Sequence, residues 1–141
     1  MRIIYEFEAH GHPNIKSTHK TTLMTTVEST LTKRGTCIIA VDSEIGLSQL
    51  PDEIKKIARS PKTNISFKLR SGSHIFESRG IGHPNLTYSD PKDMVVRKSK
   101  YTCGRTLMIC SEKSAKDIPK ELIKILQSNE NKITVQLIYE K

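Results

Sequence analysis

The sequence predicts a strand-rich α+β domain, a sandwich or closed barrel of two similar halves with two short helices packed outside. Three observations predict this fold. The chain has 141 residues, the size of one ordinary domain. Short segments rich in β-branched and aromatic residues alternate with turn residues. The tetrapeptide Gly-His-Pro-Asn occurs at residues 11–14 and again at 82–85, each time after a similar strand-like segment.

Each half is expected to contain the same series of elements. An opening strand leads into the Gly-His-Pro-Asn turn, where proline fixes its own φ and biases the preceding residue away from the helical region. Then follow a polar strand, a short apolar strand, a short helix that starts near a proline, and a closing strand. The predicted strands are 3–9, 21–29, 36–41 and 64–69 in the first half, and 73–79, 94–101, 106–110 and 132–139 in the second.

The two helices each present one apolar stripe to the core. Apolar residues recur at a spacing of three and four positions, which is the pattern of a helix with one buried face. The residues of the two stripes are Ile54, Ile57 and Ala58 in the first half, and Leu122, Ile125 and Leu126 in the second.

The halves match in more than the turn. Four blocks recur in the same order, and the small differences in spacing fall in loops, which is difficult to obtain by chance. We therefore expect a single domain over residues 1–141, made by duplication of repeats at about 3–70 and 74–140, whose pairing removes unpaired sheet edges. The matched blocks are 4–14 with 75–85, 36–40 with 106–110, 51–60 with 119–128, and 64–69 with 132–137.

Composition favours an anionic partner and excludes some classes of protein. Lys and Arg total 23 against 15 Asp and Glu, which gives a net charge of +8. Aromatic residues make up only 5%, which argues against proteins that stack single-stranded bases on aromatic platforms. No apolar run approaches the roughly 20 residues of a membrane span, and the start lacks the pattern of a signal peptide. We expect a cytoplasmic protein with no membrane partner.

Histidines are the first candidates for chemistry. His12 and His83 occupy equivalent turn positions, where an imidazole can act as an acid, a base or a metal ligand. Alternatively, each ring only bonds the backbone of its own turn. His19 would complete a site confined to the first half. We expect no metal, because these histidines lack companion ligands at the right spacing, and no cofactor, because no phosphate-loop or dinucleotide motif is present.

Basic residues gather after each turn. Residues 92–105 hold five basic groups and one acid. If 94–101 is a strand, Lys98 shares a face with the apolar Met94 and Val96, which indicates a cation that lines a cleft. The functional interpretation is a pocket for phosphate or carboxylate, and the alternative is a solvated edge strand that lysine protects. The predicted anion-binding residues are Lys20, Arg34, Arg97, Lys98 and Arg105.

Two other kinds of side chain complete the candidates. Asp42 and Glu112 each follow an apolar strand, either as acid–base groups or as ion-pair partners of Arg34 and Arg105. Of the three cysteines, two lie in apolar runs and are expected to be buried. Cys103 lies in a polar stretch, where a reactive thiol is an open alternative.

Several strings of the sequence resemble one archaeal family, the domain of unknown function 371. They are GHPN-IKSTHKTTL, LTKRGTCIIAV and DMVVRKSKYTCGRTLMI followed by EKSAKDI, and together they span nearly the whole chain. The resemblance implies a cytoplasmic protein with a jelly-roll-like β-sandwich, and it implies no activity or cofactor. The motif positions it picks out are His12, His19, Lys20, Arg34, Arg97, Lys98 and Arg105.

Three functions compete. The first is a module that binds a phosphate-bearing anion such as a nucleotide or RNA. The second is a small enzyme in which His12 or His83 is the general base and Lys20, Arg97 or Arg105 holds the substrate. The third is a structural protein whose exposed sheet edge builds a homo-oligomer.

Overall fold

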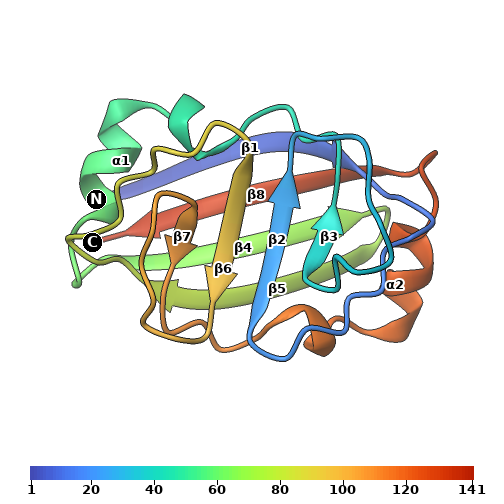
Figure 1. The fold of residues 1–141 in the computed structure, drawn as a ribbon. Coiled ribbons are helices and arrows are strands. Elements are labelled where there is room, and N and C mark those ends of the chain that lie inside the picture. Colours follow the sequence, from blue (N-terminus) through green and yellow to red (C-terminus); the bar gives the residue numbers. More distant parts are fainter.

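Eight strands form two four-stranded sheets in the computed structural model, which describes residues 1–141 (Figure 1). The first sheet is wholly antiparallel. In spatial order it contains β1 (Arg2–His10), β8 (Lys132–Glu140), β4 (Asn64–Ser71) and β5 (His74–Ile81). The second sheet contains β3 (Ile38–Ala40), β2 (Thr22–Thr26), β6 (Asp93–Arg97) and β7 (Thr106–Met108). Its central strands, β2 and β6, are antiparallel, and each has a parallel outer neighbour.

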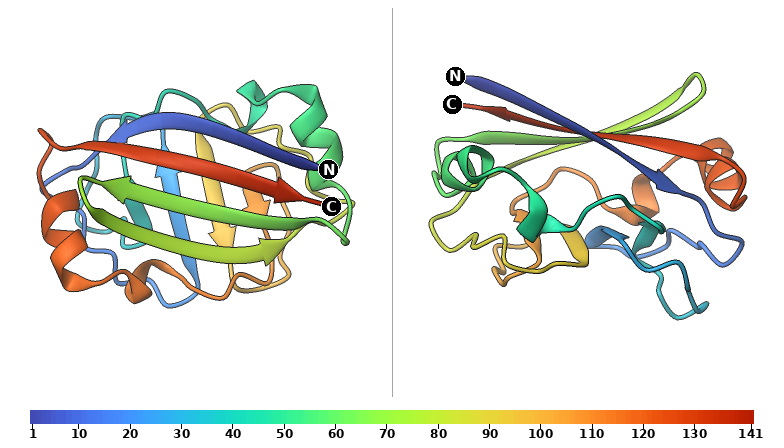
Figure 2. Two further views of the ribbon diagram at one scale, coloured as in Figure 1. Left: turned by 180° about the vertical axis from the view of Figure 1, so that it is seen from behind. Right: turned by 90° about the horizontal axis from the view of Figure 1, so that it is seen from above.

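The hydrophobic core lies between the two sheets, whose strands run in crossing directions (Figures 1 and 2). Side chains alternate between the faces of each strand, so every second residue points into the core. In β4, for example, Ile65, Phe67 and Leu69 are buried, whereas the residues between them are half-buried. The other face of the first sheet is open to solvent and carries mostly polar side chains.

Two short helices lie at opposite ends of the molecule (Figures 1 and 2). They are α1 (Asp52–Ala58) and α2 (Lys120–Leu126), and Pro51 and Pro119 immediately precede them. A short 3₁₀ turn comes before each helix, η1 (Leu47–Gln49) in the first half and η2 (Ala115–Asp117) in the second. The predicted stripes face the core, except that Ile125 is only half-buried.

The prediction of a strand-rich fold with two helices is confirmed, but the alternative of a closed barrel is wrong. Each sheet ends in edge strands, β1 and β5 in the first and β3 and β7 in the second. Between the first sheet and the segments that follow β3 and β7, the strand pairing is limited to isolated bridges, His10 to Val41 and Ile81 to Ile109. Short strands β3 and β7 therefore leave the sheets open instead of closing them into one cylinder.

Four predicted strands, β2, β3, β6 and β7, are shorter than expected. β2 ends at Thr26 and β6 ends at Arg97, whereas the sequence predicted strands to residues 29 and 101. After Arg97 the chain leaves the sheet. The structure contains no helix that is long and apolar enough to cross a membrane.

Candidate anion-binding site

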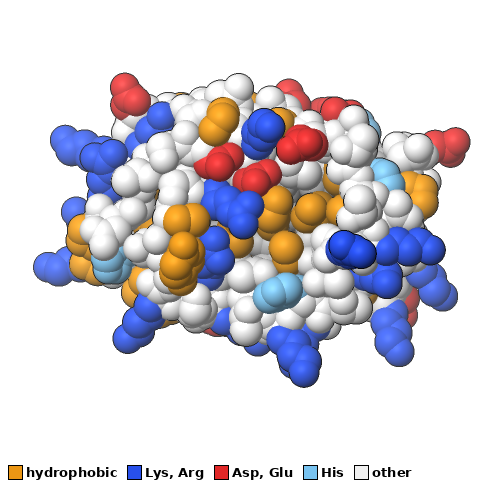
Figure 3. All heavy atoms as spheres, viewed as in Figure 1, with side chains coloured by type: hydrophobic (Ala, Val, Ile, Leu, Met, Phe, Trp, Pro, Cys, Tyr) orange, Lys and Arg blue, Asp and Glu red, His pale blue; other side chains and the backbone are white.

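The outer face of the second sheet carries most of the predicted basic strand. Alternation turns Leu23, Met94 and Val96 into the core and leaves the residues between them on the outer face. Their register forms three opposite pairs, Thr22 with Arg97, Met24 with Val95, and Thr26 with Asp93. The face therefore has a cationic end, an apolar middle and an acidic end. Figure 3 shows acidic side chains toward the top of this face and exposed apolar ones near its middle.

Arg97 is held by neighbours that are not carboxylates. Its Nε donates to Thr106 Oγ1 at 2.9 Å, and its Nη2 donates to Cys103 Sγ at 3.5 Å. The guanidinium carbon lies 4.8 Å from the centre of the Tyr101 ring, in the range of a cation–π contact. Arg97 is half-buried, and no carboxylate lies within 4.0 Å of it. A partly desolvated cation without a counter-ion attracts an anion.

The thiol of Cys103 belongs to the same group of contacts. Burial acts to raise its pKa, but the hydrogen bond from the backbone N–H of Arg105 and those with Thr106 and Arg97 outweigh burial. The pKa of Cys103 is therefore lowered from its ordinary value. This shift agrees with the alternative of a reactive thiol that the sequence left open.

His19 lies at the cationic end of the same face. Its Nδ1 atom accepts the backbone N–H groups of Thr21 at 3.2 Å and Thr22 at 3.1 Å. The Thr22 hydroxyl, 3.0 Å from the same nitrogen, lies directly opposite Arg97 in the sheet. Because the lone pair of Nδ1 is occupied, the neutral ring carries its proton on Nε2. His19 is therefore a hydrogen-bond donor beside Arg97.

Lys98 was predicted to be a cation that lines a cleft. It lies just beyond the end of β6. Its backbone N–H bonds the carbonyl of Thr21, and its ammonium lies 3.5 Å from Asp117 Oδ2 in η2. The Lys98 side chain is only 32% exposed, as a cleft-lining cation would be. Its partner, however, is an acid of the protein itself.

Lys20 and Arg34 lie in two loops, one directly before β2 and one before β3. The segment around Lys20 is fixed to η2, since the Ser114 hydroxyl donates to the Lys20 carbonyl at 2.8 Å. The loop that contains Arg34 is bonded to the same segment through Thr36, whose carbonyl accepts the backbone N–H of His19 at 3.2 Å. Both cationic side chains are exposed and have no carboxylate within 4.0 Å. Tertiary contacts thus join the backbone segments that carry His19, Lys20 and Arg34 near the end of the sheet at which Thr22 faces Arg97.

Arg105 is neutralised by Asp93. Its Nη1 donates to Asp93 Oδ2 at 3.1 Å, because the backbone at Arg105 hydrogen-bonds Val95 in the neighbouring strand. The expected ion pairs of Arg34 and Arg105 with Asp42 and Glu112 are wrong. Asp42 instead faces His10, with Asp42 Oδ2 at 3.5 Å from His10 Nδ1.

A cavity of about 260 Å³ adjoins the acidic end of the face. Its apolar lining comes from Met24, Leu31 and Ile38, and its acidic lining from Glu28 and Asp93. Apolar and hydrogen-bonding groups side by side suit the uncharged part of a small ligand.

His12 and His83 do not share a site. Each Nδ1 accepts the backbone N–H two residues later, from Asn14 and from Asn85, both at 3.0 Å. The prediction that each ring bonds its own turn is confirmed. The backbone N–H of His12 also donates to the carbonyl of Leu126 at the end of α2. The backbone N–H of His83 donates to the carbonyl of Ala58 at the end of α1. Since α1 and α2 are at opposite ends (Figure 1), the two histidines are far apart.

Neither turn histidine is arranged as the general base that the enzyme hypothesis requires. A general base needs a free lone pair within reach of the substrate. In both rings the lone pair of Nδ1 is occupied, and the proton is therefore on the outward Nε2. His12 and His83 are hydrogen-bond donors in their neutral form.

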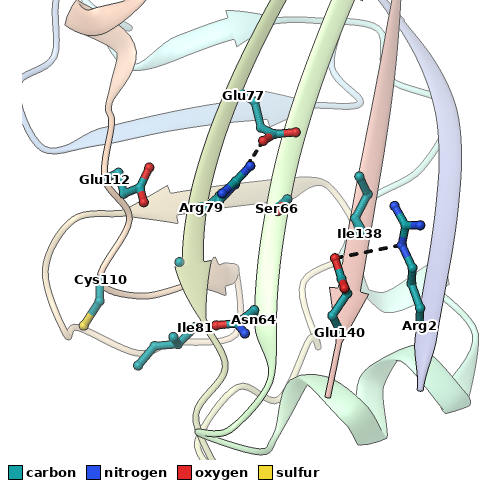
Figure 4. A pocket seen from close by; sticks show the side chains of 11 residues that line it. Arg2, Asn64, Ser66, Glu77, Arg79, Ile81, Cys110, Glu112, Ile138 and Glu140 are labelled. Atoms are coloured by element: carbon teal, nitrogen blue, oxygen red, sulfur yellow. Dashed lines mark hydrogen bonds and ion pairs between the residues drawn. The ribbon is translucent and has the colours of Figure 1, made fainter.

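The largest cavity, about 570 Å³, lies on the outer face of the first sheet and contains none of the predicted anion-binding residues (Figure 4). Its charges largely pair with each other. Arg79 Nε lies 3.1 Å from Glu77 Oε1, and Arg2 Nε lies 3.9 Å from Glu140 Oε1. Glu112 adds a further negative charge to the lining. This cavity is therefore a poor candidate for an anion site.

Other functional residues of the candidate site were missed from the sequence. Tyr101, Thr106 and Asp93 surround Arg97 and Arg105, yet no motif marked them. Thr106 was visible only as the first residue of an apolar block. Within residues 1–141, no group of three or more His, Cys, Asp or Glu side chains is arranged to hold a metal ion.

Comparison with known proteins places the chain in a family. The profile of a domain of unknown function, DUF371, matches residues 7–140. The chain belongs to the DUF371 family. An uncharacterised protein of the archaeon Methanocaldococcus jannaschii is 41% identical over 126 residues, which cover 89% of this chain and 93% of that protein. The family was predicted from the sequence strings, and it brings no activity with it.

Proposed function

We propose that this DUF371 protein binds a small phosphate-bearing ligand, such as a nucleotide, on the outer face of its second sheet. One observation carries the proposal. The guanidinium of Arg97 is half-buried, oriented by Thr106 and Cys103, and has no carboxylate partner. A guanidinium that is already oriented forms charge-assisted bonds to a phosphate with little further loss of entropy.

Residues near Arg97 would also contribute to binding the phosphate. His19 offers an Nε2–H donor, and Lys20 and Arg34 add positive charge from the flanking loops. Lys98 and Arg105 are already paired with acids, so they contribute less. The uncharged part of the ligand would extend toward the cavity at the other end of the face, which Met24, Leu31 and Ile38 line.

We also infer that the fold is a β-sandwich made by internal duplication. Both halves contain the same order of elements, and β2 and β6 lie together at the centre of one sheet as β4 and β8 do in the other. Backbone details repeat as well, since each half has a positive φ just after its single bridge, at Asp42 and at Cys110. These likenesses support a common origin of the two halves.

Binding of AMP, measured by calorimetry at low salt, tests the proposed function. Arg97→Met keeps the length of the side chain and removes its charge and donors. We expect at least about a tenfold loss of affinity, because a hydrogen bond to a charged group contributes roughly 1.5–3 kcal/mol. Arg70→Met is the matched control, since Arg70 is exposed on the first sheet, and it should bind AMP like the wild type.

Two further ligands separate the alternatives. Adenosine lacks the phosphate and should bind far more weakly than AMP. A single-stranded RNA that binds better than AMP, with an affinity that falls steeply with salt, would replace a small ligand with a polyanion. If neither AMP, inorganic phosphate nor RNA binds or raises the melting temperature, the proposed function is wrong.

A further inference from the structure

A separate cavity of about 310 Å³ lies at the end of β1. It shares no lining residue with the cavity at the acidic end of the second sheet. Its polar side chains come from the end of β1, the first Gly-His-Pro-Asn turn, the turn after β3 and two loops. They are His10, His12, Ser29, Asp42 and Asn129. With neutral imidazoles the only formal charge in this lining is that of Asp42, so the cavity disfavours an anionic ligand.

His10 is oriented toward Asp42. Its Nδ1 atom is shielded from solvent and has no hydrogen-bond partner, and Asp42 Oδ2 lies 3.5 Å from it. A shielded ring nitrogen beside a carboxylate carries the proton, because a lone pair there would face negative charge. The lone pair of His10 is then on Nε2. Since 40% of this side chain is exposed, Nε2 is within reach of a ligand.

His12, in the same cavity, has the opposite tautomer. Its Nδ1 accepts the backbone N–H of Asn14, so its proton is on Nε2. The cavity therefore contains one imidazole with a free lone pair and one imidazole with a free N–H. A base and a hydrogen-bond donor in one cavity are the two groups that general acid–base chemistry on a carbonyl compound needs.

The second half of the chain shows that the fold does not need the pair of His10 and Asp42. Ile81 ends β5 as His10 ends β1, and each makes an isolated bridge to the residue that follows β7 or β3. Cys110 has the same positive φ as Asp42, 55° against 51°. Ile81 and Cys110 thus perform the same structural task without an ionisable pair (Figure 4). The histidine and the carboxylate are extra to the architecture.

We propose that His10, Asp42 and His12 form an acid–base site that hydrolyses a small uncharged ester or lactone. Nε2 of His10 takes a proton from water while the water oxygen bonds to the carbonyl carbon. The Nε2–H of His12 donates to the oxyanion. The bond between this carbon and the alkoxy oxygen then breaks, and the His10 imidazolium returns the proton to the leaving alcohol. The products are a carboxylic acid and an alcohol, and the site is restored.

The residues have different roles in this proposal. His10 and His12 touch the substrate, whereas Asp42 is a positioning residue that acts through the tautomer of His10. An ester or lactone fits better than an amide, because an alkoxide leaves without the strong acid that an amine requires. Water is the only co-reactant.

The first test reads the tautomers directly. Long-range ¹H–¹⁵N NMR at high pH, where the rings are neutral, should show the proton of His10 on Nδ1 and the protons of His12, His19 and His83 on Nε2. Asp42→Gly tolerates the positive φ at this position, and it should move the proton of His10 toward Nε2. A merely structural carboxylate would leave the tautomer unchanged.

The second test uses hydrolysis of p-nitrophenyl acetate as the probe reaction. His10→Ile copies the residue at the equivalent position of β5, so the variant should fold, which a melting curve checks. We expect kcat/KM to fall by about 100-fold or more, since general acid–base catalysis contributes 10²–10⁴-fold. His12→Asn should lower kcat with little change in KM, because the oxyanion exists only in the transition state.

His83→Asn is the matched control for the turn histidine, and its rate should equal that of the wild type. The site is refuted if His10→Ile hydrolyses the probe as fast as the wild type, or if His10 carries its proton on Nε2. Loss of AMP binding in Arg97→Met with an unchanged hydrolysis rate would show that the two sites are independent.

Discussion

The chemistry of individual side chains follows from where their lone pairs and protons lie. In His12, His19 and His83 the backbone occupies Nδ1, whereas in His10 a carboxylate faces it. Of these four histidines, three are therefore hydrogen-bond donors in their neutral form, whereas the Nδ1 atom of His10 faces Asp42. Arg97 is likewise distinguished by its partners, which are the Thr106 hydroxyl, the Cys103 thiol and the Tyr101 ring and include no carboxylate.

The buried pair of Tyr88 and Tyr139 makes stability sensitive to alkali. Tyr88 donates to the Leu107 carbonyl at 2.7 Å, and the two hydroxyls are 3.0 Å apart. Burial is the main cause that raises the pKa of both phenols above the ordinary value near 10. Both groups therefore hold their protons more tightly in the folded state. Their contribution to stability is complete below pH 10 and is lost as the pH rises through the folded values.

Ultraviolet titration and urea unfolding check this pair. Tyr88 and Tyr139 should ionise only on unfolding. Tyr139→Phe leaves Tyr88 bonded to Leu107 and should cost about 0.5–1.5 kcal/mol. Tyr88→Phe deprives both Leu107 and Tyr139 of a partner and should cost more. Ionisation of all four tyrosines in the folded protein would contradict this account.

At the scale of elements, the Gly-His-Pro-Asn turn joins a strand to a helix of the other half. His12 N–H bonds Leu126 at 2.8 Å and His83 N–H bonds Ala58 at 3.0 Å, so each turn satisfies a carbonyl at a helix C-terminus. The glycine permits this approach, since a Cβ on Gly11 would collide with the carbonyl oxygens of Leu126 and Ser128. The repeated tetrapeptide is thus explained by packing, and His12 gains its place in the cavity as a consequence.

Gly11→Ala should destabilise the protein strongly. The added methyl meets backbone oxygens, which cannot move without disturbing α2, so we expect a loss of roughly 2 kcal/mol or more. This corresponds to a fall in melting temperature on the order of 5–10 °C. Gly72→Ala is the control, because a Cβ there meets open space and costs only its positive φ, about 1 kcal/mol. Equal effects of the two substitutions would show that close approach is unimportant.

At the scale of the whole molecule, the two halves are interleaved. In the first sheet β1 and β4 belong to the first half, yet β8 of the second half lies between them. In the same way β4 separates β5 from β8. Neither half can form its part of this sheet alone. The edges of β1 and β5 are unpaired in this sheet. The homo-oligomer therefore stays a prediction, which light scattering can test.

Separated halves should therefore not fold. We expect a peptide of residues 1–72 to show a random-coil circular dichroism spectrum, because its strands β1 and β4 lack their shared partner. An equimolar mixture with residues 73–141 should regain strand signal, and the intact chain should unfold in one transition. A stable, folded 1–72 peptide would contradict the interleaved arrangement.

The sequence by itself determined what depends on neighbouring residues. Strand segments, proline-led helices and the turn role of His12 and His83 follow from local propensity and from bonds that span two or three residues. Strand ends were less predictable. β6 stops at Arg97, and only one further backbone bond, from Lys98 to Thr21, continues the pairing with β2.

Only the tertiary structure decided the order of the strands, the surroundings of Arg97 and the pairing of His10 with Asp42. These depend on which distant segments meet, as when β8 enters between β1 and β4 or when the turn after β3 brings Asp42 to the end of β1. Hydrophobic periodicity tells a strand which face to bury but not which strand to join. The sequence thus predicted a strand-rich basic protein and several of its cations, whereas the fold left Arg97 half-buried without a counter-ion and placed Asp42 beside His10.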